Sequence, residues 1–357
     1  MTDRPGGDAG RVALRRAVAT HAGRLAPGPW VFTGQRRMVR HWRAPGAAGH
    51  LADTRPSGPR ALGALRRAVA RARIVGWPLA GTGRGTSRDH RRLLLTADGG
   101  CLLLDDADGT VLRLLAEPVP ETYVADRREF AAHVPCPDFE VIDGGRGIRE
   151  TAVAGGSIAV LDGAARVEVL ERLLDGYAAL VAASSGPPAT GWTDRLDEAI
   201  EATELPPGLR DWLRRCRPRL VEELGSWPTV ISHGDLGAHN LIVGVDGPVV
   251  IDLEARTMGR RPFFHDPACL VLTELRSGRA DLARIVLDPS RSAAVRRCLE
   301  RAGVDPVGDG PELLLAAAMV GTWTDRRGTA SSKAVLRSMS GRWEALRPLL
   351  NGGAGIA

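Results

Sequence analysis

The sequence predicts a protein of the α+β class, with a small β-rich lobe followed by a larger α-rich lobe. Short apolar runs separated by turn signals such as DGG and ADG dominate residues 71–152. From about residue 160, apolar residues recur at the three- and four-residue steps typical of helices. A chain of 357 residues is also long enough for two domains. We therefore expect an extension over 1–70, one lobe over 71–152 and a second over 153–357.

The extension over residues 1–70 is basic, with 13 basic and 3 acidic side chains. Residues 11–25 and 59–73 have helical periodicity, and a stretch rich in Gly, Pro and Arg separates them. A basic segment of this kind could contact nucleic acid or an acidic membrane. It lacks interleaved aromatic residues and any nucleic-acid-binding motif, so we expect neither as a partner.

The predicted β-rich lobe begins with "IVGWPLAG", "RRLLLTADGG", "CLLLDDADG" and "TVLRLL", which indicate an antiparallel meander. The segment "ETYVADRREFAAHV" has helical character, and two more strands are expected in "PDFEVIDGGRGIRETAVAGG". In the second lobe, helices are predicted over 165–184, 193–203, 207–225, 264–285, 291–302, 311–324 and 331–349. Two short strands within 231–254 interrupt these helices.

The composition narrows the cellular setting. No run approaches the roughly 18 apolar residues that span a bilayer, and the N-terminus has no continuous apolar region of a signal peptide, so we expect a cytoplasmic protein. The five cysteines are scattered without a CxxC pair, which favours buried free thiols over disulfides or a zinc site. Lys333 is the only lysine, so chemistry that needs a cation depends almost entirely on arginine.

The segment "ISHGDLGAHNLIV" gathers His233, Asp235 and Asn240 just before an apolar run, and Asp252 follows in "VVIDLEAR". Phosphoryl transfer needs an acceptor hydroxyl held in line and a cation on the phosphates. A carboxylate such as Asp235 can accept the proton of that hydroxyl. An amide oxygen and a second carboxylate, from Asn240 and Asp252, suit Mg²⁺. The intervening "VDG" predicts a hairpin with Asn240 and Asp252 near each other at its base.

This motif resembles the aminoglycoside phosphotransferase (choline kinase-like) family of small-molecule kinases. "HGDLGAHNLIV", "VVIDLEA" and "FFHDPACL" are similar to its catalytic loop, metal-binding strand and downstream Asp-Pro-Ala. The resemblance implies a two-lobed, protein-kinase-like fold. It implies that Asp235 is the catalytic base and that Asn240 and Asp252 bind Mg²⁺. It further implies that His233 shapes the loop and Asp266 braces it. The donor is expected to be ATP or GTP.

The nucleotide site is less clearly marked. In "GTGRGTSRDH", Gly83 and Gly85 would let backbone N–H groups approach phosphate, and Thr86 and Ser87 would add hydroxyl donors; a plain hairpin loop is the alternative. In "RETAVAGG", which resembles the segment between the lobes, Glu150 and Ala152 would contact the purine through their backbone. An edge strand and its turn is the alternative there.

The family expects a phosphate-binding lysine paired with a helical glutamate, and this chain has Arg113 and Glu129 at the corresponding places. Arginine keeps the charge but presents it as a planar fork. Arg113 could be a working substitute. Alternatively, another arginine (Arg84, Arg88 or Arg92) contacts the phosphates, or activity has been lost.

For the acceptor, the resemblance leaves aminoglycosides, macrolides, nucleoside-type antibiotics, choline, homoserine and sugars. The acidic segment "DRLDEAIEATEL" could line a site for a polycation or could be a solvated helix face. Residues 260–357 carry 15 basic and 10 acidic side chains, which slightly favours a neutral or anionic acceptor. Our preferred hypothesis is an antibiotic O-phosphotransferase that confers resistance or self-resistance. The alternatives are a metabolic small-molecule kinase and a non-catalytic kinase-like binding protein.

Overall fold

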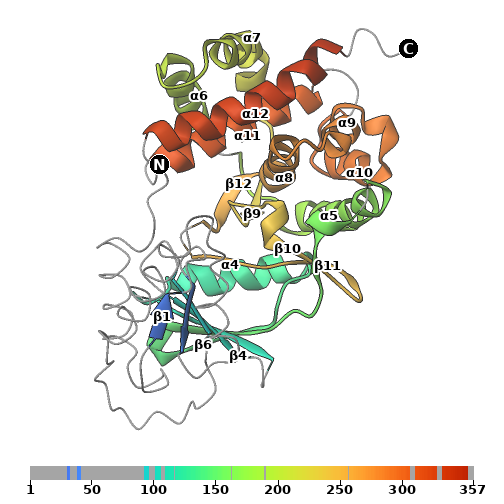
Figure 1. Ribbon diagram of the computed structural model, residues 1–357. Helices are drawn as coiled ribbons and strands as arrows, with labels where there is room; N and C mark the ends of the chain where they lie inside the picture. The colour runs from blue at the N-terminus through green and yellow to red at the C-terminus, as the bar shows by residue number, and fades with distance from the viewer. Residues whose placement is uncertain are drawn as a thin grey trace, which may run out of the picture. The chain divides into compact units, whose positions relative to one another are not determined.

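The computed structural model describes residues 30–32, 38–41, 92–95, 101–105, 109–115, 117–161, 163–188, 190–255, 257–305, 310–327 and 332–352 (Figure 1). The helices predicted over 11–25 and 59–73, and the segment "IVGWPLAG", lie outside these residues. The chain divides into two compact units. One contains the residues up to Pro120 together with Pro137–Ala152, and the other contains Glu121–Cys136 and the chain from Val153 onward. The predicted α+β class is confirmed.

The first unit is built on an antiparallel sheet whose described strands follow the order β1-β2-β3-β4-β5-β7-β6. Its strands are β1 (Trp30–Phe32), β2 (Met38–His41), β3 (Arg92–Leu95), β4 (Cys101–Asp105), β5 (Thr110–Leu114), β6 (Phe139–Ile142) and β7 (Gly147–Thr151). The predicted meander is confirmed for β3, β4 and β5, which pair in sequence order. Leu112, Arg113 and Leu114 of β5 are all buried, so both faces of the strand are covered at this end.

The second unit is mostly helical. Its helices are α4 (Glu121–Ala131), α5 (Gly163–Ser184), α6 (Trp192–Glu201), α7 (Pro207–Leu224), α8 (His265–Arg276), α9 (Asp281–Leu287), α10 (Ala293–Arg301), α11 (Gly310–Arg327) and α12 (Ser332–Gly352). Large side chains fill its core, among them Trp212, Trp227 and Trp323, each at most 1% exposed. Burying such rings removes 150–250 Å² of surface each, roughly, which makes them dominant contributors to core stability.

Four short strands are described between α7 and α8, where the sequence predicts two. β9 (Thr229–Ser232) pairs with β12 (Gly259–Pro262), and β10 (Leu241–Gly244) pairs with β11 (Gly247–Val250) in a hairpin with a two-residue turn. β8 (Gly156–Ser157) adds to the other edge of β10. Because His233 follows β9 and Asn240 precedes β10, these two small sheets hold both ends of the predicted catalytic loop.

The prediction of one helix over 264–285 is wrong, because the chain forms α8 and α9 with a break between them. Gly278 has a left-handed backbone (φ 79°), and its N–H donates to the carbonyl of Leu275. The N–H of Arg279 donates to Glu274, which completes a Schellman motif. A residue with a side chain is disfavoured at that φ, so glycine ends the helix where periodicity alone continued it.

In the described part of the chain, Cys136, Cys216, Cys269 and Cys298 are free thiols, and all but Cys136 are buried. Burial raises the pKa of the Cys298 thiol to about 12, so this group is un-ionised at neutral pH. Among the described helices, none has both the length and the apolar character that a bilayer crossing requires.

Candidate active site

The predicted catalytic loop runs from β9 to β10 and presents Asp235 to solvent. Asp235 is exposed, whereas His233 and Asn240 are 1% and 4% exposed. The side-chain amide of Asn240 donates to the carbonyl of Asp235 (3.0 Å), which ties the two ends of the loop together. Gly234 has φ 81°, and a Cβ there would clash with the carbonyl of Thr257. The loop therefore needs glycine immediately before Asp235.

The imidazole of His233 connects the catalytic loop to the predicted metal-binding strand. Its Nδ1 accepts the backbone N–H of Asp235 at 3.2 Å, so the proton must be on Nε2. Nε2 then donates to the carbonyl of Ile251 at 3.0 Å. His233 thus acts through geometry, by fixing the peptide before Asp235 against the residue before Asp252.

Asp266, at the start of α8, accepts hydrogen bonds from the catalytic loop and from α5. Its Oδ2 accepts the backbone N–H of His233 (2.6 Å) and the hydroxyl of Tyr177 (2.7 Å). Its Oδ1 accepts the N–H of Gly234 (2.9 Å). The carboxylate is 1% exposed, so these bonds replace water. Asp266 therefore holds the peptide groups that precede Asp235.

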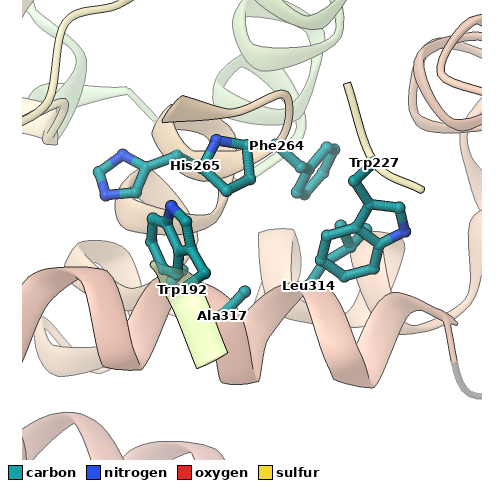
Figure 2. A pocket seen from close by; sticks show the side chains of 8 residues that line it. Trp192, Trp227, Phe264, His265, Leu314 and Ala317 are labelled. Atoms are coloured by element: carbon teal, nitrogen blue, oxygen red, sulfur yellow. The ribbon is translucent and has the colours of Figure 1, made fainter. Parts of the chain in front are cut away.

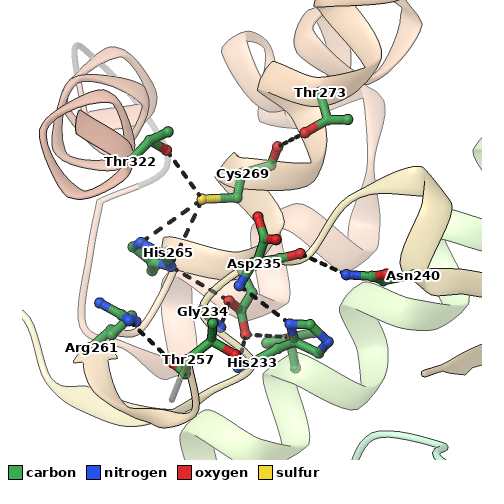
Figure 3. Close-up of polar contacts among 12 residues, drawn as sticks. His233, Gly234, Asp235, Asn240, Thr257, Arg261, His265, Cys269, Thr273 and Thr322 are labelled. Carbon is green, nitrogen blue, oxygen red and sulfur yellow. Dashed lines mark hydrogen bonds and ion pairs between the residues drawn. The ribbon is translucent and has the colours of Figure 1, made fainter. Parts of the chain in front are cut away.

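Charges around Asp266 keep it ionised. Burial works to raise its pKa, but the hydrogen bond and charge of His265 (Nδ1 to Oδ1, 3.4 Å) outweigh burial and hold that pKa well below the usual value. Burial would lower the pKa of His265, yet Cys269 and Asp266 raise it to about 9. The Sγ of Cys269 lies 3.8 Å from both imidazole nitrogens and 3.6 Å from the hydroxyl of Thr322 (Figure 3). His265 packs in the core beside Asp266.

Asp252 follows β11 after one residue, Ile251, and Asn240 directly precedes β10, so the hairpin brings the two residues to its base. Leu241 pairs with Val250, and the N–H of Ile251 donates to the carbonyl of Asn240 at 2.9 Å. The prediction that Asn240 and Asp252 lie near each other at the base of one hairpin is confirmed. Asp235 is linked to the same network through Asn240 and His233.

These residues fit a magnesium ion that is shared with phosphates. The NH₂ group of Asn240 is committed to the carbonyl of Asp235, which leaves its oxygen as the side-chain atom able to ligate a cation. Asp252, which is half-buried, supplies a carboxylate. Within the described residues, no group of three or more His, Cys, Asp or Glu side chains could hold a metal. Mg²⁺ commonly uses one or two protein oxygens plus phosphates and water, which agrees with this sparse donor set.

In the first unit, Arg113 lies on β5 and is 2% exposed, and Glu150 lies on β7 and is 6% exposed. Glu150 is in register with Val111 on one side and Phe139 on the other, inside the sheet. The N–H of Ala152 donates to the carbonyl of Gly109 at 2.7 Å. A purine at Ala152 would therefore have to use the carbonyl oxygen or displace this bond. Phosphate and purine contacts at these positions stay predictions.

Glu129, the predicted partner of Arg113, forms an ion pair with Arg260 of β12 (3.0 Å). No local sequence pattern predicts this pair. Arg260 also donates to the carbonyl of Ser184, so it joins α4 to the end of α5 within the second unit. Burial and the neighbouring Glu129 raise the pKa of Asp126 on the same helix, although Arg260 works against them. The pairing of Glu129 with Arg113 stays a prediction.

The other predicted contacts of the nucleotide fall outside the described residues, namely Gly83, Gly85, Thr86 and Ser87. The acidic segment around α6 matches the solvated-face interpretation in part: Asp197 pairs bidentately with Arg217 of α7 (2.6 and 2.8 Å), and both side chains are nearly half exposed. A small apolar cavity lies beside His265, between Trp192, Phe264 and Ala317 (Figure 2). Its volume of about 10 Å³ is that of one water, so it is no acceptor site.

Two tyrosines that are not among the predicted site residues form hydrogen bonds next to them. Tyr177 of α5 bonds Asp266, and Tyr123 of α4 donates to the carbonyl of Leu253, next to Asp252 (2.8 Å). Arg127 in turn donates to the hydroxyl of Tyr123. These are the only tyrosines of the chain, which is the one sequence feature that could have drawn attention to them.

Comparison with known proteins agrees with this geometry. Residues 117–290 match the model of the phosphotransferase enzyme family, APH. No curated protein matches the chain. Among solved structures, a glucosamine kinase is 16% identical, with 94% of this chain and 97% of that chain covered and a TM-score of 0.47.

An aminoglycoside phosphotransferase, APH(3'')-Id from Streptomyces rimosus, is 21% identical over 62% of this chain and 90% of its own, with a TM-score of 0.38. A choline/ethanolamine kinase family protein from Mesorhizobium loti is 15% identical over 78% and 94%, with a TM-score of 0.46. The family match spans α4, the catalytic loop, the metal-binding strand and α8. Residues 117–290 are thus similar to the phosphotransferase enzyme family, and this match supports a phosphotransferase with an alcohol group as acceptor.

Proposed function

We propose that the protein transfers the γ-phosphoryl group of ATP or GTP to a hydroxyl group of an antibiotic-like small molecule, as a resistance or self-resistance enzyme of the cytoplasm. The observation that carries the proposal is the single hydrogen-bonded network of the catalytic loop and metal strand. In it, Asn240 bonds Asp235, and His233 and Asn240 both bond Ile251, the residue before Asp252. This network supports a shared role of Asp235, Asn240 and Asp252 in phosphoryl transfer.

In this proposal, Asp235 accepts the proton of the acceptor hydroxyl. The hydroxyl oxygen attacks the γ-phosphorus, the bond from that phosphorus to the bridging oxygen breaks, and the nucleoside diphosphate leaves with the bonding electrons. Asp235 suits this role because it is exposed to an incoming substrate while its backbone N–H is fixed by His233. Asn240 and Asp252 would hold Mg²⁺, which neutralises charge on the phosphate oxygens.

The acceptor class follows from weaker arguments. The basic excess of residues 260–357 favours a neutral or anionic molecule over a polycation. The ion pair between Asp197 and Arg217 also neutralises part of the acidic segment that a polycation would need.

The test is product mass after incubation with Mg²⁺, ATP or GTP, and a panel of antibiotics, homoserine, choline and sugars. A gain of about 80 Da on one acceptor, the mass of a phosphoryl group, is expected. Asp235→Asn should lower kcat by about 10²- to 10⁴-fold, the usual contribution of general acid–base catalysis. Asp246→Asn is the matched control, because Asp246 is exposed in the turn of the neighbouring hairpin.

The possible results separate the hypotheses. Product with a metabolite but no antibiotic would favour a metabolic kinase and reject the resistance role. No product with any acceptor, together with no nucleotide-dependent thermal shift, would favour a non-catalytic binding protein. Equal activity of Asp235→Asn and Asp246→Asn would remove Asp235 from the mechanism.

A further inference from the structure

The backbone of Asp252 is in the left-handed region, with φ 64°. Residues other than glycine rarely adopt such a conformation, and it persists only where the surrounding structure enforces it. Asp252 lies beyond the end of β11, so strand pairing does not account for it. The neighbouring peptide groups must therefore be held from outside the strand.

On the N-terminal side of Asp252, the catalytic loop and the segment after α4 supply this restraint. The N–H of Ile251 donates to Asn240, and its carbonyl accepts Nε2 of His233. The N–H of Val250 donates to the carbonyl of Pro135 at 2.8 Å. The chain is thus fixed in direction up to the peptide that enters Asp252.

On the C-terminal side, α4 supplies the restraint through a side chain. The hydroxyl of Tyr123 donates to the carbonyl of Leu253 at 2.8 Å, and both residues are at most 2% exposed. Asp252 therefore lies between two carbonyl groups, of Ile251 and Leu253, each of which is bonded by a buried side chain. Rotation of Asp252 to an ordinary backbone conformation would break at least one of these bonds.

Arg127 determines the direction of the Tyr123 hydroxyl. Its Nη1 lies 2.9 Å from the oxygen of Tyr123, one helical turn earlier on α4, and Arg127 is 0% exposed. A guanidinium can only donate, so the tyrosine oxygen accepts there and its own hydrogen must point elsewhere. That hydrogen is directed to Leu253. A charged donor on the oxygen also strengthens the bond that the hydroxyl donates.

We propose that Tyr123 and Arg127 are positioning residues, which hold the carbonyl of Leu253 and so keep Asp252 in the left-handed conformation in which it binds Mg²⁺. This inference rests on the proposed function for its metal, but its structural part concerns the protein without ligands. The role does not require either side chain to touch nucleotide or acceptor.

The test uses Tyr123→Phe, which removes only the hydroxyl from a buried ring. The matched control is Tyr177→Phe, which removes an equally buried hydroxyl that bonds Asp266 instead. The first measurement is amide hydrogen exchange of residues 251–255 in the free protein. We expect exchange to be about fivefold faster in Tyr123→Phe, since one buried hydrogen bond is worth about that factor. Tyr177→Phe lowers the global stability, but this segment should still exchange nearly as in the wild type, because its amides exchange by local opening rather than by global unfolding.

The second measurement is the dependence of ADP binding on Mg²⁺. Calorimetry gives the Mg²⁺ concentration at which ADP binding is half-maximal. Tyr123→Phe should raise it by about fivefold, because part of the metal's binding energy must restore the conformation of Asp252. We also expect the kcat of Tyr123→Phe to be lower than that of the wild type at limiting Mg²⁺ and equal to it at saturating Mg²⁺. A double-mutant cycle with Arg127→Met should show that the two effects are not additive, because both act through one hydroxyl.

Unchanged exchange and unchanged Mg²⁺ dependence in Tyr123→Phe would overturn the inference. So would equal effects of Tyr123→Phe and Tyr177→Phe on both measurements, which would indicate a general loss of stability. If the wild-type protein binds ADP with no dependence on Mg²⁺, the role of Mg²⁺ in the proposed function is rejected. The exchange measurement still decides in that case whether Tyr123 holds the segment.

Discussion

The hydroxyl of Tyr177 donates a hydrogen bond of 2.7 Å to Oδ2 of Asp266, the same oxygen that accepts the backbone N–H of His233. One buried carboxylate therefore joins α5 to the loop that presents Asp235. Burial and the charge of Asp266 raise the pKa of Tyr177 well above its usual value, so the hydroxyl remains a donor. The position of the catalytic loop thus depends on residues far from it in sequence.

Tyr177→Phe should lower the free energy of unfolding by about 1.5–3 kcal/mol, the range for hydrogen bonds to charged groups. The phenyl ring would keep its edge-to-face contact with Phe130, whose centroid lies 5.9 Å away, so the loss isolates the hydroxyl. Urea unfolding monitored by circular dichroism measures the change. A loss below about 0.5 kcal/mol, within the range of ordinary surface substitutions, would show that Asp266 does not need this donor.

The acid sensitivity of the protein should depend on Asp266. Its pKa lies well below the ordinary 3.8, because the hydrogen bond and charge of His265 outweigh the effect of burial. The unfolded chain takes up the proton near the ordinary pKa, whereas the folded chain resists it. The stabilisation is therefore complete above the ordinary pKa and is lost as the pH falls below it.

Urea unfolding of the wild type and of Asp266→Asn between pH 5 and pH 2.5, roughly, should reveal this difference. Below the ordinary pKa, the wild type should lose up to about 1.4 kcal/mol per pH unit more than the variant. If the unfolding free energies of the wild type and of Asp266→Asn change equally with pH, folding does not lower the pKa of Asp266. If Asp266→Asn does not fold, Tyr177→Phe serves as the comparison. The wild type should then still lose more unfolding free energy than the variant as the pH falls, but by a smaller amount.

The catalytic loop and its hairpin could be predicted from sequence because their residues are close along the chain. His233, Asp235 and Asn240 lie within one loop, and a two-residue turn brings Asp252 back to Asn240. The contacts of Tyr123 and Tyr177 could not be predicted, since they join residues 130 and 89 positions apart. Helical periodicity places such residues on a buried face, but it does not identify which buried group they meet.

The ion pair of Glu129 could not be predicted for the same reason. Its position on α4 was predicted, but its partner Arg260 follows 131 residues later on a strand of only four residues. Likewise, hydrophobic periodicity predicts one helix across Gly278, whereas the left-handed backbone of Gly278 ends the helix there. Local patterns therefore predict elements and loops, whereas long-range polar partners depend on a packing arrangement that no short pattern specifies.

Gly321 on α11 should be intolerant of a side chain. A Cβ there would lie 2.9 Å from Nε2 of His265 and 2.9 Å from the ring of Trp192. Both rings are buried and cannot move away easily, so Gly321→Ala should cost about 1–2 kcal/mol of unfolding free energy through overpacking. Gly341→Ala on α12 is the matched control, because its Cβ would meet only Arg276 carbons at 3.5 and 3.7 Å.

For Gly341→Ala the ordinary helix preference for alanine should prevail, with a gain of about 0.5–1 kcal/mol. Thermal and urea unfolding of both variants give the comparison. Stabilisation by Gly321→Ala similar to that of Gly341→Ala would contradict the close packing of His265 against α11.

The buried ion pair between Arg166 of α5 and Glu274 of α8 should be the most costly to break. Nε of Arg166 lies 3.4 Å from Oε2 of Glu274, and their side chains are 8% and 0% exposed. Arg279 also pairs with Glu274, and Arg166 donates to the carbonyl of Leu161 at 2.7 Å. Glu274→Gln would leave the charge of Arg166 buried without its counter-ion, with an expected loss of about 3 kcal/mol or more.

Two comparisons separate charge burial from simple loss of a contact. Glu344→Gln removes the partner of Arg347 in a pair whose side chains are 60% and 53% exposed, and it should change stability by less than about 0.5 kcal/mol. The double variant Arg166→Met, Glu274→Leu should be more stable than Glu274→Gln alone, because no charge of that pair stays buried. Urea unfolding measures all three. If Glu274→Gln costs no more than Glu344→Gln, the pair at the junction of α5 and α8 makes no more difference to stability than a surface contact.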